Sequence, residues 1–292
     1  MFNPEHPKLS RNTLPIRDPE IISFVKKTDS NNFLFNALQN LELKDIFLNE
    51  YFSWVQTSKL NNLNGIKKFK NLSYVHGTSQ SFDAFYAENK NRRFRCFKGD
   101  FFYHSISWRN NYNYSFIDEE KLQPNDAVVI SVPFSDNGYI HPDTEEVLEI
   151  CNKLEIPVLI DLAYYNLARG IDFNLDEPCI STITFSLSKG FSLLDRLRIG
   201  MRCKRNFNDD PVDVFNSFDM FNKAGAALGL EIIKNFSPDH NQNKFHAKQK
   251  DVCSKFKFEQ SNCVVFGLGD ESYSKFNRGS HWNRVCISNF LV

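Results

Sequence analysis

The sequence predicts an α/β protein with one large domain, whose central sheet is mainly parallel and flanked by helices, and a small α+β portion at the C-terminal end. Three apolar runs indicate buried strands: AVVISV at 127–132, IPVLIDL at 156–162 and STITFSL at 181–187. A helical pattern with acids in its first turn, 142–154, separates the first two runs. Strands that are buried on both faces and joined by crossovers are typical of a parallel sheet.

Residues 1–60 are predicted to form an N-terminal arm followed by helices. The first seventeen residues are polar and contain Pro4, Pro7 and Pro15, which favours an extended arm of the kind that reaches across a dimer. Asp18-Pro19-Glu20 is typical of a helix start, because it supplies a capping carboxylate, a proline and an acid in the first turn. Apolar residues at helical intervals over 33–56 predict one or two further helices.

The rest of the chain divides into a large domain at 61–205, which is expected to bind the ligand, and a small C-terminal domain at 206–292. A fourth strand of the large domain is expected at 198–203. The small domain is expected to contain two helical stretches, 212–234 and 245–258, and two short strands, 263–267 and 284–291.

Composition excludes several classes of partner. Thirty-five basic and thirty-five acidic residues give a formal net charge of zero, so neither nucleic acid nor an anionic membrane surface is expected as a partner. A small neutral or zwitterionic molecule fits this balance better. Seven cysteines without a CxxC pair favour a reducing, cytoplasmic environment. The sequence contains neither a signal peptide pattern nor an apolar run of about twenty residues, so we expect no membrane span.

Three polar residues follow the predicted strands at the edge where ligands bind in α/β sheets. Asp161 lies near the end of IPVLIDL, Tyr164 follows three positions later, and Lys189 comes after the next strand. A lysine can bind an aldehyde as a Schiff base, and a carboxylate can hold a pyridine nitrogen protonated. A phenol near the ring hydroxyl adds the third group that pyridoxal phosphate chemistry requires. A lone lysine in such a place is usually a solvated loop residue, and a lone aspartate a helix cap.

At these positions the sequence resembles the fold-type I pyridoxal-phosphate enzymes, in particular the class I/II aminotransferase family. The chain is shorter than is usual for this family, so it resembles a shortened member. The resemblance depends on VVISVPFSDNG, PVLIDLAYY and STITFSLSKGFSLLDRLRIG, which occur in the family's order and at about its distances. SYVHGTSQSF resembles the family's glycine-containing turn, and NRVCIS its final arginine segment. The resemblance covers residues 72–204 and then only the segment around Arg284.

The resemblance implies a role for each matching residue. Lys189 would bind the cofactor aldehyde as an internal aldimine, Asp161 would pair with the pyridine nitrogen, and Tyr164 would donate to the ring hydroxyl. Arg284 would bind the substrate α-carboxylate. The phosphate and the rest of the cofactor would be held by Gly77, Thr78, Ser79, Ser186, Ser188 and Arg198.

Three departures from the family pattern leave alternatives open. Ser135 stands where the family has the asparagine beside the ring hydroxyl, and Asn137 is a candidate to replace it. Arg198 lies nine residues after Lys189, one more than is common, so Arg196 competes for the phosphate. Three residues are candidates for the aromatic side chain that stacks on the ring: Tyr103, His104 and Trp108. Of these, we include Trp108 among the predicted cofactor-binding residues.

The resemblance implies a homodimeric aminotransferase that moves an amino group between an amino acid and a 2-keto acid. The same groups also serve a pyridoxal-phosphate lyase or decarboxylase, and the chain could instead be a catalytically idle partner subunit. A metal is not expected, because His240 and His246 have no third ligand nearby in the sequence. A dinucleotide site is not expected either, since no GxGxxG follows a predicted strand.

Overall fold

A mixed sheet of seven strands forms the centre of the large domain. The structure is a computed structural model that describes residues 8–28, 32–109 and 111–292. The strand order is β2-β9-β8-β6-β5-β3-β4, and β9 is antiparallel to both neighbours while all other pairs are parallel. The expected mainly parallel sheet is therefore confirmed. The strands of this sheet are β2 (Asn71–Val75), β3 (Arg93–Cys96), β4 (Tyr114–Phe116), β5 (Asp126–Ser131), β6 (Val158–Leu162), β8 (Ile180–Ser186) and β9 (Gly200–Lys204).

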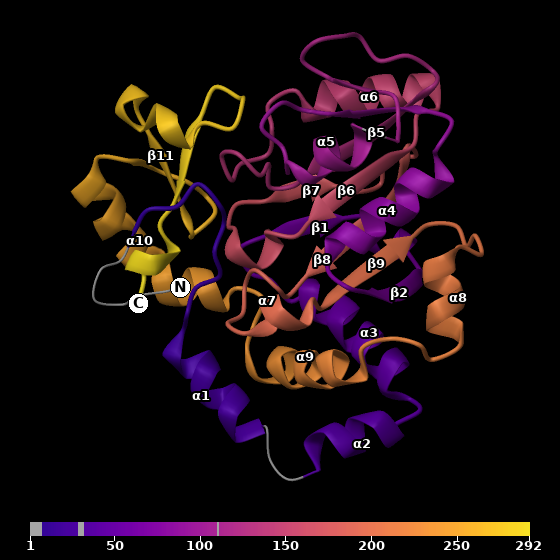
Figure 1. The fold of residues 1–292 in the computed structure, drawn as a ribbon, viewed down its shortest axis with the longest axis vertical. Helices are drawn as coiled ribbons and strands as arrows, with labels where there is room; N and C mark the ends of the chain where they lie inside the picture. The colour runs from indigo at the N-terminus through magenta and orange to yellow at the C-terminus, as the bar shows by residue number, and fades with distance from the viewer. Residues whose placement is uncertain (1–7, 29–31, 110) are drawn as a thin grey trace.

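Helices cover both faces of this sheet (Figure 1). The helix expected at Asp18 is confirmed, and the Asp18 carboxylate accepts a hydrogen bond from the Glu20 amide at 2.9 Å. The stretches 33–56 and 212–234 each form two helices. The α-helices are α1 (Pro19–Thr28), α2 (Phe33–Gln39), α3 (Leu43–Val55), α4 (Thr78–Glu88), α5 (Tyr103–Trp108), α6 (Thr144–Leu154), α7 (Leu194–Leu197), α8 (Pro211–Ser217), α9 (Lys223–Asn235) and α10 (His240–Phe256).

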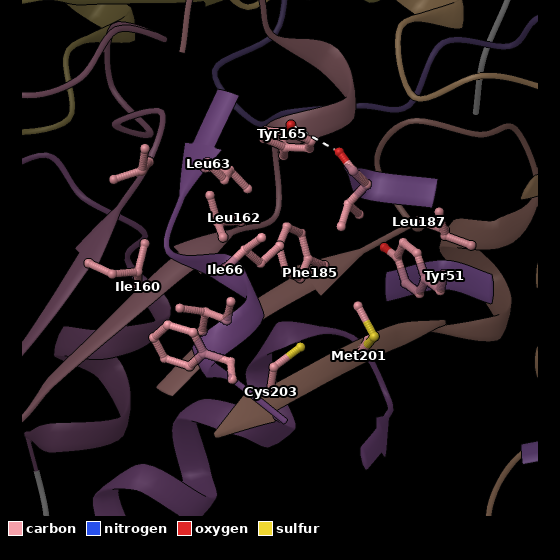
Figure 2. Packing of buried hydrophobic residues seen from close by; sticks show 14 of the residues in the cluster. Tyr51, Leu63, Ile66, Ile160, Leu162, Tyr165, Phe185, Leu187, Met201 and Cys203 are labelled. Carbon is pink, nitrogen blue, oxygen red and sulfur yellow. Dashed lines mark hydrogen bonds between the residues drawn. The ribbon is translucent and has the colours of Figure 1, made fainter. Parts of the chain in front are cut away.

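Successive residues of the central strands belong to two different cores, which explains their unbroken apolar sequences. In β5, Val128 and Ile130 face the larger core, whereas Val129 faces a smaller, aromatic core beside α4 and α5. Figure 2 shows part of the larger core, where Tyr51 of α3 lies near Phe185 of β8. The sheet is consequently buried on both faces, and its polar side chains gather at the strand ends.

The small C-terminal part contains an antiparallel sheet with the order β10-β11-β12. Its strands are β10 (Glu259–Gln260), β11 (Phe266–Gly269) and β12 (Asn283–Cys286), and two further short strands, β1 (Asn62–Asn64) and β7 (Asp172–Asn174), pair elsewhere. Four 3-10 helices complete the described structure: η1 (Ile66–Lys68), η2 (Tyr165–Leu167), η3 (Glu271–Phe276) and η4 (Ser288–Phe290). Helix α9, which lies beyond the domain boundary drawn at residue 205, packs on α3 in the larger core.

The N-terminal arm runs between the two parts of the molecule (Figure 1). Ser10 exchanges backbone hydrogen bonds with Cys286 of β12, at 3.1 and 2.8 Å, and the Ser192 hydroxyl donates to the Ile16 carbonyl oxygen. Over the described ranges, no helix has both the length and the apolar character needed to cross a bilayer. All seven cysteines lie in these ranges, buried and without disulfides.

Candidate functional site

Strand direction brings the predicted site residues to one edge of the large sheet. Strands β2, β5, β6 and β8 run the same way, so their carboxyl ends meet at this edge. Strand β9 runs the opposite way and begins there, because Gly200 pairs with both Val75 and Ser186. Residues just after the four strands and just before β9 are therefore neighbours, although they are far apart in the sequence.

A cavity at this edge, which we call the cofactor cavity, unites most of the predicted residues. Its wall is formed by Thr78, Phe101, Ser135, Asp161, Ala163, Tyr164, Ser186, Ser188, Lys189 and Arg198. The side chains offer a carboxylate, an amine, a guanidinium, a phenol and several hydroxyl groups. Such a concave site with converging polar groups is the usual form of a small-molecule site.

Asp161 is a buried carboxylate without a cationic partner. Only 5% of the residue is exposed, its Oδ1 accepts from the Ala163 amide at 3.0 Å, and no Lys, Arg or His of the described chain pairs with it. Burial, together with the charge of Asp100, raises the pKa of Asp161 to about 8, although hydrogen bonds from Ala163 and Thr78 oppose this shift. A cationic ring nitrogen placed beside it would relieve this cost.

Gly77, Ser79 and Arg198 form a cradle at the N-terminus of α4. Gly77 has φ +70°, a conformation that favours glycine, and a Cβ atom built there would lie 2.7 Å from Arg198 Nη2. Arg198 Nη2 donates to the Ser79 hydroxyl at 2.9 Å. No side chain caps this end of the eleven-residue helix, so its first amides are available to an anion. Arg196 instead points to solvent, with 80% of its side chain exposed.

Two serines shape the turn that carries Lys189. The Ser186 hydroxyl accepts from the Ser188 amide at 3.1 Å, and the Ser188 hydroxyl accepts from the Ile199 amide at 3.2 Å. The turn is thus fixed to the start of β9, and the half-buried Lys189 projects into the cavity. Its Nζ donates to the carbonyl oxygen of Thr13 at 3.2 Å.

Thr13 of the N-terminal arm is a site residue that sequence reasoning did not identify. Its hydroxyl lies 2.9 Å from the Tyr164 hydroxyl and accepts from Arg284 Nη1 at 3.1 Å. Together with the contact to Lys189, it joins three predicted site residues. The sequence predicted an arm here, but an isolated threonine between prolines carries no signal for these long-range contacts.

Arg284 lies in β12 beside the cofactor cavity, fully buried over the ring of Phe266. Its Nη1 donates to the Ser135 carbonyl oxygen at 2.7 Å and its Nη2 to the Arg11 carbonyl oxygen at 2.6 Å. Strand β12 therefore places a guanidinium behind Ser135, which lines the cavity, and next to Thr13. Two of the three oxygen atoms that accept from Arg284 belong to the arm, those of Arg11 and Thr13.

Trp108 is not the aromatic residue of the cavity, and this prediction is wrong. It is fully buried in the aromatic core, stacked on Phe94 with 5.5 Å between ring centroids. Of the other two candidates, Tyr103 donates to Asp83 and His104 bonds to the Tyr86 hydroxyl. Phe101 lines the cavity instead.

Asn137 is also held away from the cavity. Its side-chain oxygen accepts from the Tyr139 amide at 2.8 Å, which closes a local turn. Ser135 does line the cavity, and its hydroxyl donates to Asp100 at 2.9 Å. Asp100 follows β3 and also accepts from the Ser131 hydroxyl at 2.5 Å, so the same strand-end reasoning that selected Asp161 could have identified it.

Solved structures with the same architecture are aminotransferases of fold type I. The chain superimposes on an aromatic aminotransferase from Pyrococcus horikoshii OT3 with a TM-score of 0.64 and 10% identity, covering 93% of this chain and 87% of that one. A PLP-bound putative aminotransferase from Clostridium difficile 630 gives 0.62 at 12% identity, covering 93% and 85%. The histidinol-phosphate aminotransferase from Clostridium acetobutylicum gives 0.61 at 14% identity, covering 95% and 94%.

These similarities define the class of fold. No protein-family model and no curated protein matches the chain. The chain therefore has the fold-type I architecture of pyridoxal-phosphate-dependent aminotransferases. Sequence identities of 10 to 14% to these structures establish the fold and not the activity.

Proposed function

We propose that the protein is a pyridoxal-phosphate-dependent aminotransferase that moves an amino group between an amino acid and a 2-keto acid. One observation carries the proposal: Lys189, the unpaired Asp161 and the cradle of Arg198 line a single cavity at the strand ends. The residues present fit the cofactor, because the cradle is cationic and glycine-lined while the buried carboxylate lacks a positive partner. Pyridoxal phosphate, when bound, supplies an aldehyde and an electron-withdrawing ring.

The chain's own residues then have separate tasks. Arg198, Ser79 and the first amides of α4 would hold the phosphate. Asp161 would hold a proton at the ring nitrogen, and Lys189 would move a proton at the substrate α-carbon. Phe101 would cover the ring.

Tyr164 and Arg284 complete the proposed site. Tyr164 would orient the ring hydroxyl, and Arg284 would bind the substrate α-carboxylate through two parallel hydrogen bonds. Both contact Thr13, so the arm would exclude water from the same place. We further propose a homodimer, as the resemblance implies, in the cytoplasm, as the seven cysteines without a CxxC pair favour.

Product analysis tests the reaction type. The purified protein is incubated with pyridoxal phosphate and a panel of amino acids, and the products are separated. The proposal predicts a 2-keto acid and pyridoxamine phosphate in equal amounts. Release of ammonia or carbon dioxide would assign a lyase or a decarboxylase, and no product from any donor would favour an idle partner subunit.

A further inference from the structure

Asp100, in the loop after β3, is a second buried carboxylate beside the cofactor cavity. Only 6% of the residue is exposed. Its oxygen atoms accept from the Ser131 hydroxyl at 2.5 Å, the Ser131 amide at 3.2 Å, the Ser135 hydroxyl at 2.9 Å and the Phe101 amide at 2.6 Å. Ser135 and Phe101 belong to the cavity wall. Asp100 therefore lies directly behind this wall, and the four donors favour its ionised form.

The backbone around Asp100 holds the carboxylate in this place. Gly99 has φ +86°, a conformation that favours glycine, and a Cβ atom built there would lie 2.6 Å from Oδ2 of Asp136. Arg278 Nη2 donates to the carbonyl oxygen of Asp100 at 3.1 Å, whereas the ion pair of Arg278 is with Asp136, at 3.9 Å. The donors to the Asp100 carboxylate are thus neutral amides and hydroxyl groups.

Asp100 and Asp161 lie on the same face of the sheet. Ser131 ends β5 and is the register partner of Asp161 in β6. Side chains of register partners point to the same face of a sheet, and the Ser131 hydroxyl donates to Asp100. The two carboxylates are therefore neighbours at the strand ends. Next to burial, the charge of Asp100 is the second cause that raises the pKa of Asp161.

The other titratable groups around Asp100 leave its charge without a partner. Asp136 and Arg278 form an ion pair with each other, and Arg284 would bind the substrate α-carboxylate in the proposed function. Burial keeps four further neighbours uncharged at pH 7, because it raises the pKa of the first two and lowers the pKa of the last two: Tyr86, Cys96, His104 and His141.

We propose that Asp100 is a positioning residue whose negative charge keeps a proton between Asp161 and the ring nitrogen of the bound cofactor. Asp161 pairs with a cationic ring only while that proton is present, and alkaline solvent would otherwise remove it. A second buried negative charge opposes the loss, because it attracts the positive charge that the proton carries. This inference rests on the proposed function and extends it to a residue behind the cavity wall.

Calorimetric titration with two aldehyde probes tests the inference. Pyridoxal phosphate has the ring nitrogen, and its 1-deaza analogue has a C–H group in that place with the same aldehyde and phosphate. At about pH 9, above the pKa of Asp161, the unaltered protein should prefer pyridoxal phosphate, and Asp100→Asn should reduce this ratio of affinities about tenfold. The affinity of the variant for the analogue should not fall. The matched control Asp209→Asn, at an exposed aspartate, should keep the full ratio.

The cofactor-free protein gives a second reading. Because the pKa of Asp161 is raised in the fold, the stability of the unaltered protein falls as pH rises toward that value. Between about pH 5 and pH 9, the accompanying rise of the unfolding constant should be about tenfold smaller in Asp100→Asn. A purely structural role of Asp100 would shift the whole curve by the same amount at every pH. Asp100→Ser removes the same charge with a smaller side chain and is used where Asp100→Asn does not fold.

An unchanged ratio of affinities in the folded variant would overturn the inference. Stability curves of the variant and the unaltered protein that run parallel at every pH would overturn it as well. The outcome is separable from the proposed function. If neither probe binds to the unaltered protein, the proposed function fails, while the stability curves of the cofactor-free proteins still test the coupling between Asp100 and Asp161.

Discussion

Asp126 and Asp161 are two buried carboxylates at opposite ends of the same sheet, and they differ in their partners. Asp126, at the start of β5, accepts from Arg93 Nε at 2.7 Å and from Arg95 Nη1 at 2.6 Å. Asp161, near the end of β6, has only the Ala163 amide and Thr78. Burial costs an ion much less when it is paired, so breaking the first cluster should destabilise the fold, whereas the second carboxylate would gain from the cationic ring proposed above.

The largest effect that this comparison predicts concerns Lys189. Lys189→Ala should lower turnover about 10³-fold or more, because no other amine lines the cofactor cavity in the described chain. The measurement is the initial rate with the best donor of the panel. Lys248→Ala, at an exposed lysine of α10, is the matched control. Full turnover by Lys189→Ala would refute the assignment of the site.

A substitution at Asp126, at the opposite end of the sheet, should lower the stability of the fold without changing the candidate site. Asp126→Asn leaves Arg95, which is fully buried, without its counter-charge and should lower the free energy of unfolding by about 3 to 5 kcal/mol. Urea titration measures this value, with Asp251→Asn at an exposed position as control. The affinity of the folded variant for pyridoxal phosphate should not change. A loss below about 1 kcal/mol would show that the cluster does not hold the fold.

In the cofactor-free protein, Asp161→Asn should have the opposite effect on stability, because it should raise the free energy of unfolding. Because the pKa of Asp161 is about 8 in the fold and about 4 in an unfolded chain, the unfolded state binds fewer protons between these values. Stability of the unaltered protein therefore falls as pH rises from 4 to 8. The variant lacks this dependence and should be more stable at pH 8 by on the order of 5 kcal/mol, although it loses turnover. Parallel stability curves of the two proteins would contradict this.

The smallest effect should come from a neutral hydroxyl in the cradle. Ser79→Ala removes the partner of Arg198 and should weaken pyridoxal phosphate binding about three- to tenfold, the range of one ordinary hydrogen bond. Absorbance titration gives the dissociation constant, and Ser254→Ala on exposed α10 is the control. Unchanged affinity in Ser79→Ala would place the phosphate elsewhere.

The sequence correctly predicted which side chains lie close together where the order of the strands alone decides this. Asp161 lies near the end of β6 and Lys189 follows the neighbouring parallel strand β8, so the hydrophobic pattern was sufficient to predict that they are close together. Thr13 reaches the same place from the N-terminal arm, and no local pattern encodes that approach.

The errors have local causes. Trp108 lies on the side of α5 that packs on β3, because a large ring gains more from full burial than from the cavity wall. The Asn137 side chain closes a turn before Gly138, a use of asparagine that competes with ligand contacts. Helix α9 was assigned to the small domain from its position in the sequence, whereas its apolar face packs on α3.

The central claim is that Lys189 binds pyridoxal phosphate, and borohydride trapping tests it most directly. The purified protein is mixed with the cofactor, its visible spectrum is recorded, and it is reduced and digested for peptide mass mapping. The account predicts an absorption band that reduction removes and a phosphopyridoxyl group on the peptide containing Lys189. No band and no modified peptide would contradict it, and the similarity to aminotransferases would then be one of fold only.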